Sequence, residues 1–224
     1  NNNKINNLKL ESTFPNKKKI ILTIKTNNNS ETITKLLTAY PKPLIKRYDF
    51  IKGFEEGYLN FFSSKKEGVS NSVLIIDNFK VQEVPVFAKI LSLASLQGIA
   101  DLLTGEGIRF TDFEMNFSNQ KGVTTIDEMY AIGPAVSILM DGYIENKKLV
   151  SLRGTLVPAT TINRSIASIP LLGKILIGNK TGEGIFGVSF KIKGSPKNLK
   201  TTVNPIKTLT PRFITRTLEK IKKN

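Results

Sequence analysis

Residues 108–157 read IRFTDFEMNFSNQKGVTTIDEMYAIGPAVSILMDGYIENKKLVSLRGTLV and carry the clearest signal of secondary structure in the chain. Apolar and polar residues alternate along much of it, as at Val136, Ile138 and Met140. Such alternation is typical of strands that bury one face. Turn-forming residues interrupt it at 119–122, 133–134 and 146–147. The spacing of these turns predicts an antiparallel meander.

Alternation also occurs outside this stretch. It places Ile20, Leu22 and Ile24 on one strand, and a second strand carries the set Phe186, Val188, Phe190 and Ile192. We expect that second set and the set Val136, Ile138 and Met140 to lie on the same apolar side of one curved antiparallel sheet. The apolar residues at 113, 115 and 117 are out of phase with those at 108 and 110, which predicts a bulge or bend near 111–112.

Four segments have helical spacing instead. Pro85 suits the first turn of a helix, and an apolar helix is predicted over 86–103. Two more are predicted over 161–177, where Pro170 should introduce a kink, and over 209–221. A weaker helix is expected over 30–40, with Ser30 as its cap. The sequence therefore predicts a mainly β protein with helices, in the α+β class.

The composition excludes several kinds of active site. The 224 residues include no Cys and no His, so neither a Ser-His-Asp nor a Cys-His hydrolase is possible. Residues 182–187, GEGIFG, have the spacing of a dinucleotide fingerprint, and residues 173–181 are close to a P-loop. Neither has the preceding strand that such motifs require. We therefore predict no enzyme activity, no catalytic residues, no cofactor and no metal.

The formal net charge of +15 indicates a polyanionic partner, either nucleic acid or an anionic membrane surface. The positive charge is concentrated in residues 1–66 and 189–224. No RNA-reading motif is present, so nucleic acid is not expected. The helix over 209–221 has an apolar stripe and a basic remainder, a pattern typical of helices that lie on anionic lipid. The membrane-surface candidates are Arg212, Arg216, Lys220, Lys222 and Lys223. The alternative is that this stripe packs on the protein's own sheet.

Several motifs, taken in order, resemble the C-terminal region of the AsmA-like family, the bridge-like lipid-transfer proteins of the YhdP and TamB type. They are VPVFAKILSLASLQG (84–98), GEGIRF (105–110), GTLVPA (154–159), IPLLG (169–173), GEGIF (182–186), VNP (203–205) and LTPRF (209–213). Arg212 stands where the family usually has Gly. The resemblance divides the chain into residues 1–66, the end of a preceding repeat-like β segment, and residues 67–224, a C-terminal domain continuous with it.

The resemblance implies a curved antiparallel sheet that forms an apolar trough capped by amphipathic helices. It also implies a periplasmic protein of the Gram-negative envelope, anchored in the inner membrane through an N-terminal segment. The start at Asn1 leads us to expect that this segment is missing from the chain. The implied partners are phospholipid, an anionic membrane surface and envelope proteins, and the implied role is phospholipid transport to the outer membrane.

The residue sets at 136–140 and 186–192 are the lipid-groove candidates under this resemblance. A second hypothesis stays open, in which the protein conducts no lipid and has a structural or regulatory role in outer-membrane assembly. A continuous, open apolar groove favours the first hypothesis, and a closed, filled core favours the second.

Overall fold

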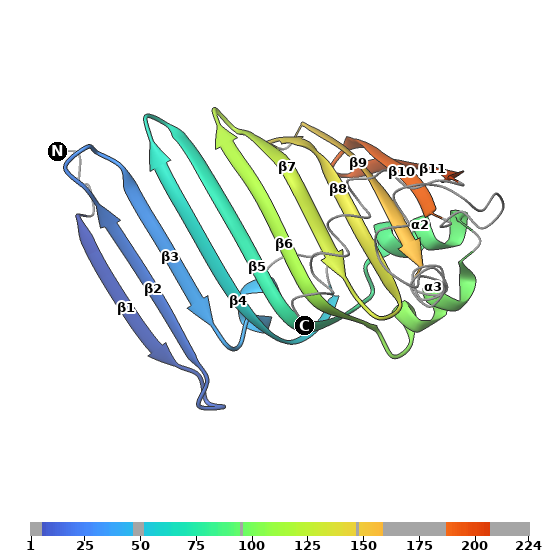
Figure 1. Cartoon of the computed structure of the whole chain (residues 1–224), viewed down its shortest axis with the longest axis horizontal. Helices are drawn as coiled ribbons and strands as arrows, with labels where there is room; N and C mark the ends of the chain where they lie inside the picture. The colour runs from blue at the N-terminus through green and yellow to red at the C-terminus, as the bar shows by residue number, and fades with distance from the viewer. Residues whose placement is uncertain (1–5, 47–51, 95, 147, 159–186, 207–224) are drawn as a thin grey trace, which may run out of the picture.

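One open, curved antiparallel sheet of eleven strands dominates the computed structural model, which describes residues 6–46, 52–94, 96–146, 148–158 and 187–206 (Figure 1). Its strands are β1 (Asn7–Thr13), β2 (Lys19–Thr26), β3 (Thr32–Thr38), β4 (Lys52–Lys66), β5 (Val69–Gln82), β6 (Ile108–Gln120), β7 (Val123–Ile132), β8 (Val136–Glu145), β9 (Leu149–Pro158), β10 (Gly187–Ser195) and β11 (Asn198–Ile206). Their order in the sheet is their order along the chain. The mainly β prediction and the meander over 108–157 are confirmed.

Tight turns explain why consecutive strands pair. Glu67 and Gly68 join β4 to β5 with φ values of 51° and 79°, and Lys121 and Gly122 join β6 to β7 with 48° and 80°. Two left-handed residues in succession are the signature of the hairpin turn whose twist matches that of the flanking strands. Glycine takes the second position at no steric cost, and so each hairpin closes in a fixed register.

The described helices gather at one end of the strands. They are α1 (Lys42–Ile45), α2 (Pro85–Leu93) and α3 (Gln97–Thr104). Helix α2 contacts β11, and α3 contacts β5, although six positions in the sheet separate these two strands. This pair of contacts requires the sheet to curve around the two helices, as Figure 1 shows on the side of β8 to β11.

A compact core lies beneath the helix pair. Leu91 of α2 and Leu103 of α3 are fully buried, and both belong to one cluster with Ile108, Val136 and Leu156 from the sheet. Burying a large aliphatic side chain contributes about 1.5–3 kcal/mol each. The helix pair therefore closes this end of the sheet with an ordinary hydrophobic core.

The predicted helix over 86–103 is two helices. The backbone N–H of Leu96 donates to the carbonyl of Leu91, and the Leu96 carbonyl accepts from the N–H groups of Ile99 and Ala100. Leu96 therefore ends the hydrogen bonding of α2 and begins that of α3. The apolar composition predicted the helices correctly but carried no signal for the break between them.

The predicted helix over 30–40 is wrong, because this segment is strand β3. Thr32, Ile33 and Thr34 are β-branched and fit a pleated strand better than a helix. Pairing with β2 on one side and β4 on the other satisfies the strand backbone. Ser30, expected as a helix cap, instead has a φ of 58° in the turn before β3.

The predicted bend near 111–112 corresponds to an irregularity in the neighbouring strand. The ladder pairs Asp77 with Asp112 and Phe79 with Phe110, so Asn78 lies opposite Thr111. Asn78 has a φ of 51°, a left-handed conformation inside a strand.

The sheet runs without interruption across residue 66, where the resemblance places the end of the preceding β segment. Strand β4 pairs with β5 from Lys66 onward, so both parts belong to the same sheet.

Candidate functional site

One row of apolar positions crosses all eleven strands on the same face of the sheet. Residues directly opposite one another in an antiparallel ladder project to the same face. Following the pairs from β1 to β11 gives Leu10, Leu22, Leu36, Phe61, Leu74, Met115, Met129, Met140, Gly154, Phe190 and Val203. We call these eleven residues the apolar row. Ten steps between neighbouring strands give it a length of about 48 Å along the sheet.

Most of the apolar row is partly exposed. Leu10 at one end is 47% exposed, and only Phe190, at 4%, is buried. The other eight apolar side chains of the row are half-buried. All three methionines of the chain stand side by side within it. Methionine is flexible and polarizable, and it is common on surfaces that accept ligands of varied shape.

A second apolar row, next to the first on the side of the helices, is mostly closed. It contains Leu59, Ile76, Ala131, Leu156 and Val188, each 5% exposed or less, together with the half-buried Phe113 and Ile138. The row on the opposite side of the apolar row is mixed, and there Ser72 Oγ donates a hydrogen bond of 2.9 Å to Ser63 Oγ. The face therefore changes from a filled core at the helices, through an open apolar strip, to a partly polar margin.

Gly154 preserves the continuity of the apolar row. A Cβ atom at this position would lie 2.5 Å from Phe190 Cζ and 2.5 Å from the Leu139 carbonyl oxygen. The Phe190 ring therefore covers the place where Gly154 has no side chain. Glycine in a strand interior often marks such a close approach.

The other face of the sheet is mainly polar and charged. Five basic residues project from it, because each lies an odd number of residues from the apolar-row member of its own strand. They are Lys9, Lys25, Lys35, Arg153 and Lys191. It also carries some exposed apolar residues, including Tyr58 at 58% and Phe62 at 40%. The contrast between the two faces is thus strong but not complete.

A double hydrogen bond joins Arg109 and Glu56 at the surface. Nη1 and Nη2 of Arg109 donate to the two carboxylate oxygens at 2.7 Å and 3.1 Å. These hydrogen bonds and the arginine charge lower the pKa of Glu56, and the same hydrogen bonds and the glutamate charge raise the pKa of Arg109. Both side chains are exposed, so solvent screens the pair.

The structure brings most of the lipid-groove candidates to one face. Ile138, Met140, Phe190 and Ile192 share the face of the apolar row with Val136 and Val188, which confirms the predicted common side. Val136 and Val188 are fully buried, and Phe190 and Ile192 are only 4% and 6% exposed, so these four belong to the core and not to an open surface. Ile138 and Met140 are half-buried. Contact of these residues with lipid stays a prediction.

Some predicted residues lie outside the described part of the chain. They are Phe186, Arg212, Arg216, Lys220, Lys222 and Lys223. The motifs at 173–181 and 182–186 and the helices predicted over 161–177 and 209–221 also lie outside it.

The half-buried residues of the apolar row on β3, β4 and β5 were not predicted from the sequence. Leu36 was assigned to a helix, and Phe61 and Leu74 were not singled out. Met115 and Met129 also went unassigned, although the first belongs to a set whose alternation was recognised. Alternation with a period of two in each strand could have identified these residues as apolar-face positions. Their alignment into one row depends on the register between strands, which the sequence does not show.

No helix in the described ranges combines the length and apolar character needed to cross a bilayer. In those same ranges, no three carboxylate, imidazole or thiol side chains gather closely enough to hold a metal ion. A comparison of the chain with protein-family models, curated protein sequences and solved structures found no match in any of the three.

Proposed function

We propose that the chain binds phospholipid acyl chains along the apolar row and forms a segment of a lipid-conducting trough. The observation that carries this proposal is the unbroken pairing of ten apolar side chains and one glycine across eleven strands. Eight of these side chains are half-buried and Leu10 is exposed, which leaves apolar surface available to a ligand. Each methylene group transferred from water to such a surface contributes about 0.8 kcal/mol.

The shape of the surface favours a long, flexible ligand. A compact ligand would call for a closed apolar cavity with a few convergent polar groups. The apolar row is instead a strip about 48 Å long that is closed on one side by the core beneath α2 and α3. Acyl chains match such a strip, because they are apolar along their length and adapt to its curvature.

The resemblance to the AsmA-like family supports the same proposal. The motif at 84–98 spans α2 and the start of α3, GEGIRF leads into β6, and VNP lies in β11. These motifs therefore fall on the helix pair and on strands that curve around it. Under this proposal the protein works in the envelope, between an inner-membrane anchor and the outer membrane.

The filled core beneath α2 and α3 favours a second candidate function. Leu91, Leu103, Val136 and Val188 leave no apolar surface there for a ligand. A protein whose working part is this closed end would shape or regulate the envelope without carrying lipid. Counting the phospholipid bound to the purified chain separates the two candidate functions.

The experiment compares two adjacent phenylalanines on opposite faces of β4. Phe61 belongs to the apolar row, and Phe62 is 40% exposed on the polar face. The chain and its Phe61→Glu and Phe62→Glu variants are purified without detergent, and bound phospholipid is counted by mass spectrometry. Circular dichroism checks that all three proteins contain the same sheet.

We expect phospholipid on the unmodified chain and on Phe62→Glu, and several-fold less on Phe61→Glu, because a carboxylate in the strip must be desolvated when acyl chains cover it. Absence of phospholipid from all three proteins favours the structural role. Equal loss in both variants contradicts binding along the apolar row.

A further inference from the structure

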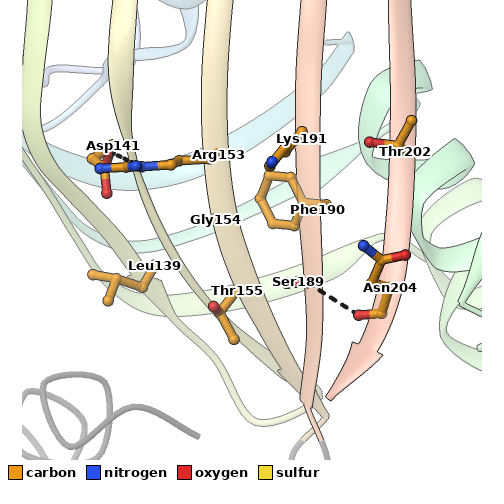
Figure 2. Close-up of a pocket in the computed structure, with 10 residues that line it drawn as sticks. All are labelled: Leu139, Asp141, Arg153, Gly154, Thr155, Ser189, Phe190, Lys191, Thr202 and Asn204. Atoms are coloured by element: carbon orange, nitrogen blue, oxygen red, sulfur yellow. Dashed lines mark hydrogen bonds and ion pairs between the residues drawn. The ribbon is translucent and has the colours of Figure 1, made fainter.

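Three charged residues and one threonine form an outward-facing row, here called the charged row, on the polar face of β8 to β11. The register places Asp141 opposite Arg153, Arg153 opposite Lys191, and Lys191 opposite Thr202. Arg153 Nε donates to Asp141 Oδ1 at 2.8 Å, as Figure 2 shows. Asp141 therefore forms an ion pair with Arg153 on one side, while on the other side Arg153 lies opposite Lys191, which carries the same charge.

A row of neutral polar groups lies next to the charged one. Thr155, Ser189 and Asn204 are paired across β9, β10 and β11, two residues along each strand from the charged row. The two rows, together with Leu139, Gly154 and Phe190, line a depression of about 400 Å³ (Figure 2). It therefore offers hydroxyl and amide groups beside two cations.

The charges around the depression are unbalanced. Strands β9, β10 and β11 contain Arg153, Lys191, Lys193 and Lys200 but no Asp or Glu. Lys193 lies directly opposite Lys200, which makes a second like-charge pair next to that of Arg153 and Lys191. Like charges directly opposite one another destabilise a sheet. An anion held between them relieves that repulsion.

We propose that this depression binds a phosphate group between Arg153 and Lys191. A planar guanidinium forms two parallel hydrogen bonds with phosphate, and an ammonium adds a point charge. Thr155 and Thr202 supply hydroxyl donors at the sides. Asp141 opposes the binding, because it competes for Arg153 and repels an anion. The ligand is therefore a phosphate monoester or inorganic phosphate, presented either free or as a lipid headgroup.

This inference does not rest on the proposed function, because Arg153 and Lys191 project from the face opposite the apolar row. The test is a titration of the chain with inorganic phosphate at pH 7.4, with sodium chloride used to hold the ionic strength constant. Backbone amide resonances report the binding. We expect saturable shifts at residues 153–155, 189–191 and 202–204.

Three variants and a control probe the site. Arg153→Gln and Lys191→Gln should each weaken binding about tenfold or more, the effect of removing one charge-assisted hydrogen bond. Asp141→Asn should tighten it by a few-fold, because a nearby like charge is removed. Lys25→Gln is the control: Lys25 is an exposed lysine on the same face, opposite Asn7 and Ile33, and its loss should change nothing.

Vesicles distinguish the two sources of phosphate. A lipid headgroup is assigned if the chain co-sediments with phosphatidic acid vesicles but not with pure phosphatidylcholine vesicles, and if Lys191→Gln abolishes this co-sedimentation. Binding of inorganic phosphate without co-sedimentation assigns free phosphate. Shifts that chloride reproduces at equal ionic strength, or that persist in both Arg153→Gln and Lys191→Gln, overturn the proposal.

Discussion

Phe190 fills the space that Gly154 leaves in the apolar row, and it is 4% exposed. We predict that Phe190→Asp lowers the free energy of unfolding by about 4 kcal/mol or more, because it removes a buried ring and introduces a carboxylate in its place. Urea denaturation measures the loss. Lys191→Ala, one residue further on and exposed, should change stability by no more than about 0.5 kcal/mol. Similar losses in both variants would contradict the alternation of faces along β10.

The pair of Glu56 and Arg109 makes a prediction about pH. Hydrogen bonds from Arg109 lower the pKa of Glu56 in the folded protein. A carboxyl group with a lowered native pKa adds stability above its unfolded pKa, and that stability is lost as the pH falls through the native pKa. Glu56→Gln should therefore melt below the unmodified chain at neutral pH, and the difference should shrink as the pH falls below the ordinary glutamate pKa.

Thermal melting between neutral and acidic pH checks this, and salt should reduce the difference because the pair is exposed. Glu55→Gln is the control, since Glu55 lies 3.7 Å from Lys42 and makes the longer ion pair. A melting difference for Glu56→Gln that stays constant down to acidic pH would show that the ionised pair is not its cause.

Helix α2 places two leucines in opposite environments. Leu91 is fully buried in the core, whereas Leu93 is 52% exposed. We predict that Leu91→Ala lowers the free energy of unfolding by about 2–5 kcal/mol, the range for a truncated core leucine. Leu93→Ala should stay within about 0.5 kcal/mol. Chemical denaturation compares them, and equal effects would mean that α2 does not pack on the sheet through Leu91.

The elements differ in how far sequence alone predicted them. Strands β6 to β9 were predicted because alternation and turn residues agree there. Strand β3 was missed because Ile33, Leu36 and Leu37 also suit one face of a helix, and only pairing with β2 and β4 decides between the two. Tertiary contacts of this kind regularly override local propensity.

At the scale of the whole molecule, the apolar row depends on how separate strands align. Each strand shows its own alternation, but a shift of one residue in any pairing would turn the following strands over and break the row. The β7 ladder has an irregularity between Ile126 and Met129, and Met129 still pairs with both Met115 and Met140. Sequence reasoning could therefore predict a sheet with one apolar face but not an unbroken strip across eleven strands.

The proposed function requires lipid to lie on one face of the sheet. To test this, a photo-crosslinking amino acid is placed at Leu22, Leu36 or Phe61 of the apolar row, and at the adjacent Thr23, Lys35 or Phe62 of the other face. After irradiation with phospholipid vesicles, mass spectrometry counts lipid adducts at each position. We predict adducts at the three row positions and few or none at their neighbours. Equal adduct yields on both faces, or none at the row positions, would contradict it.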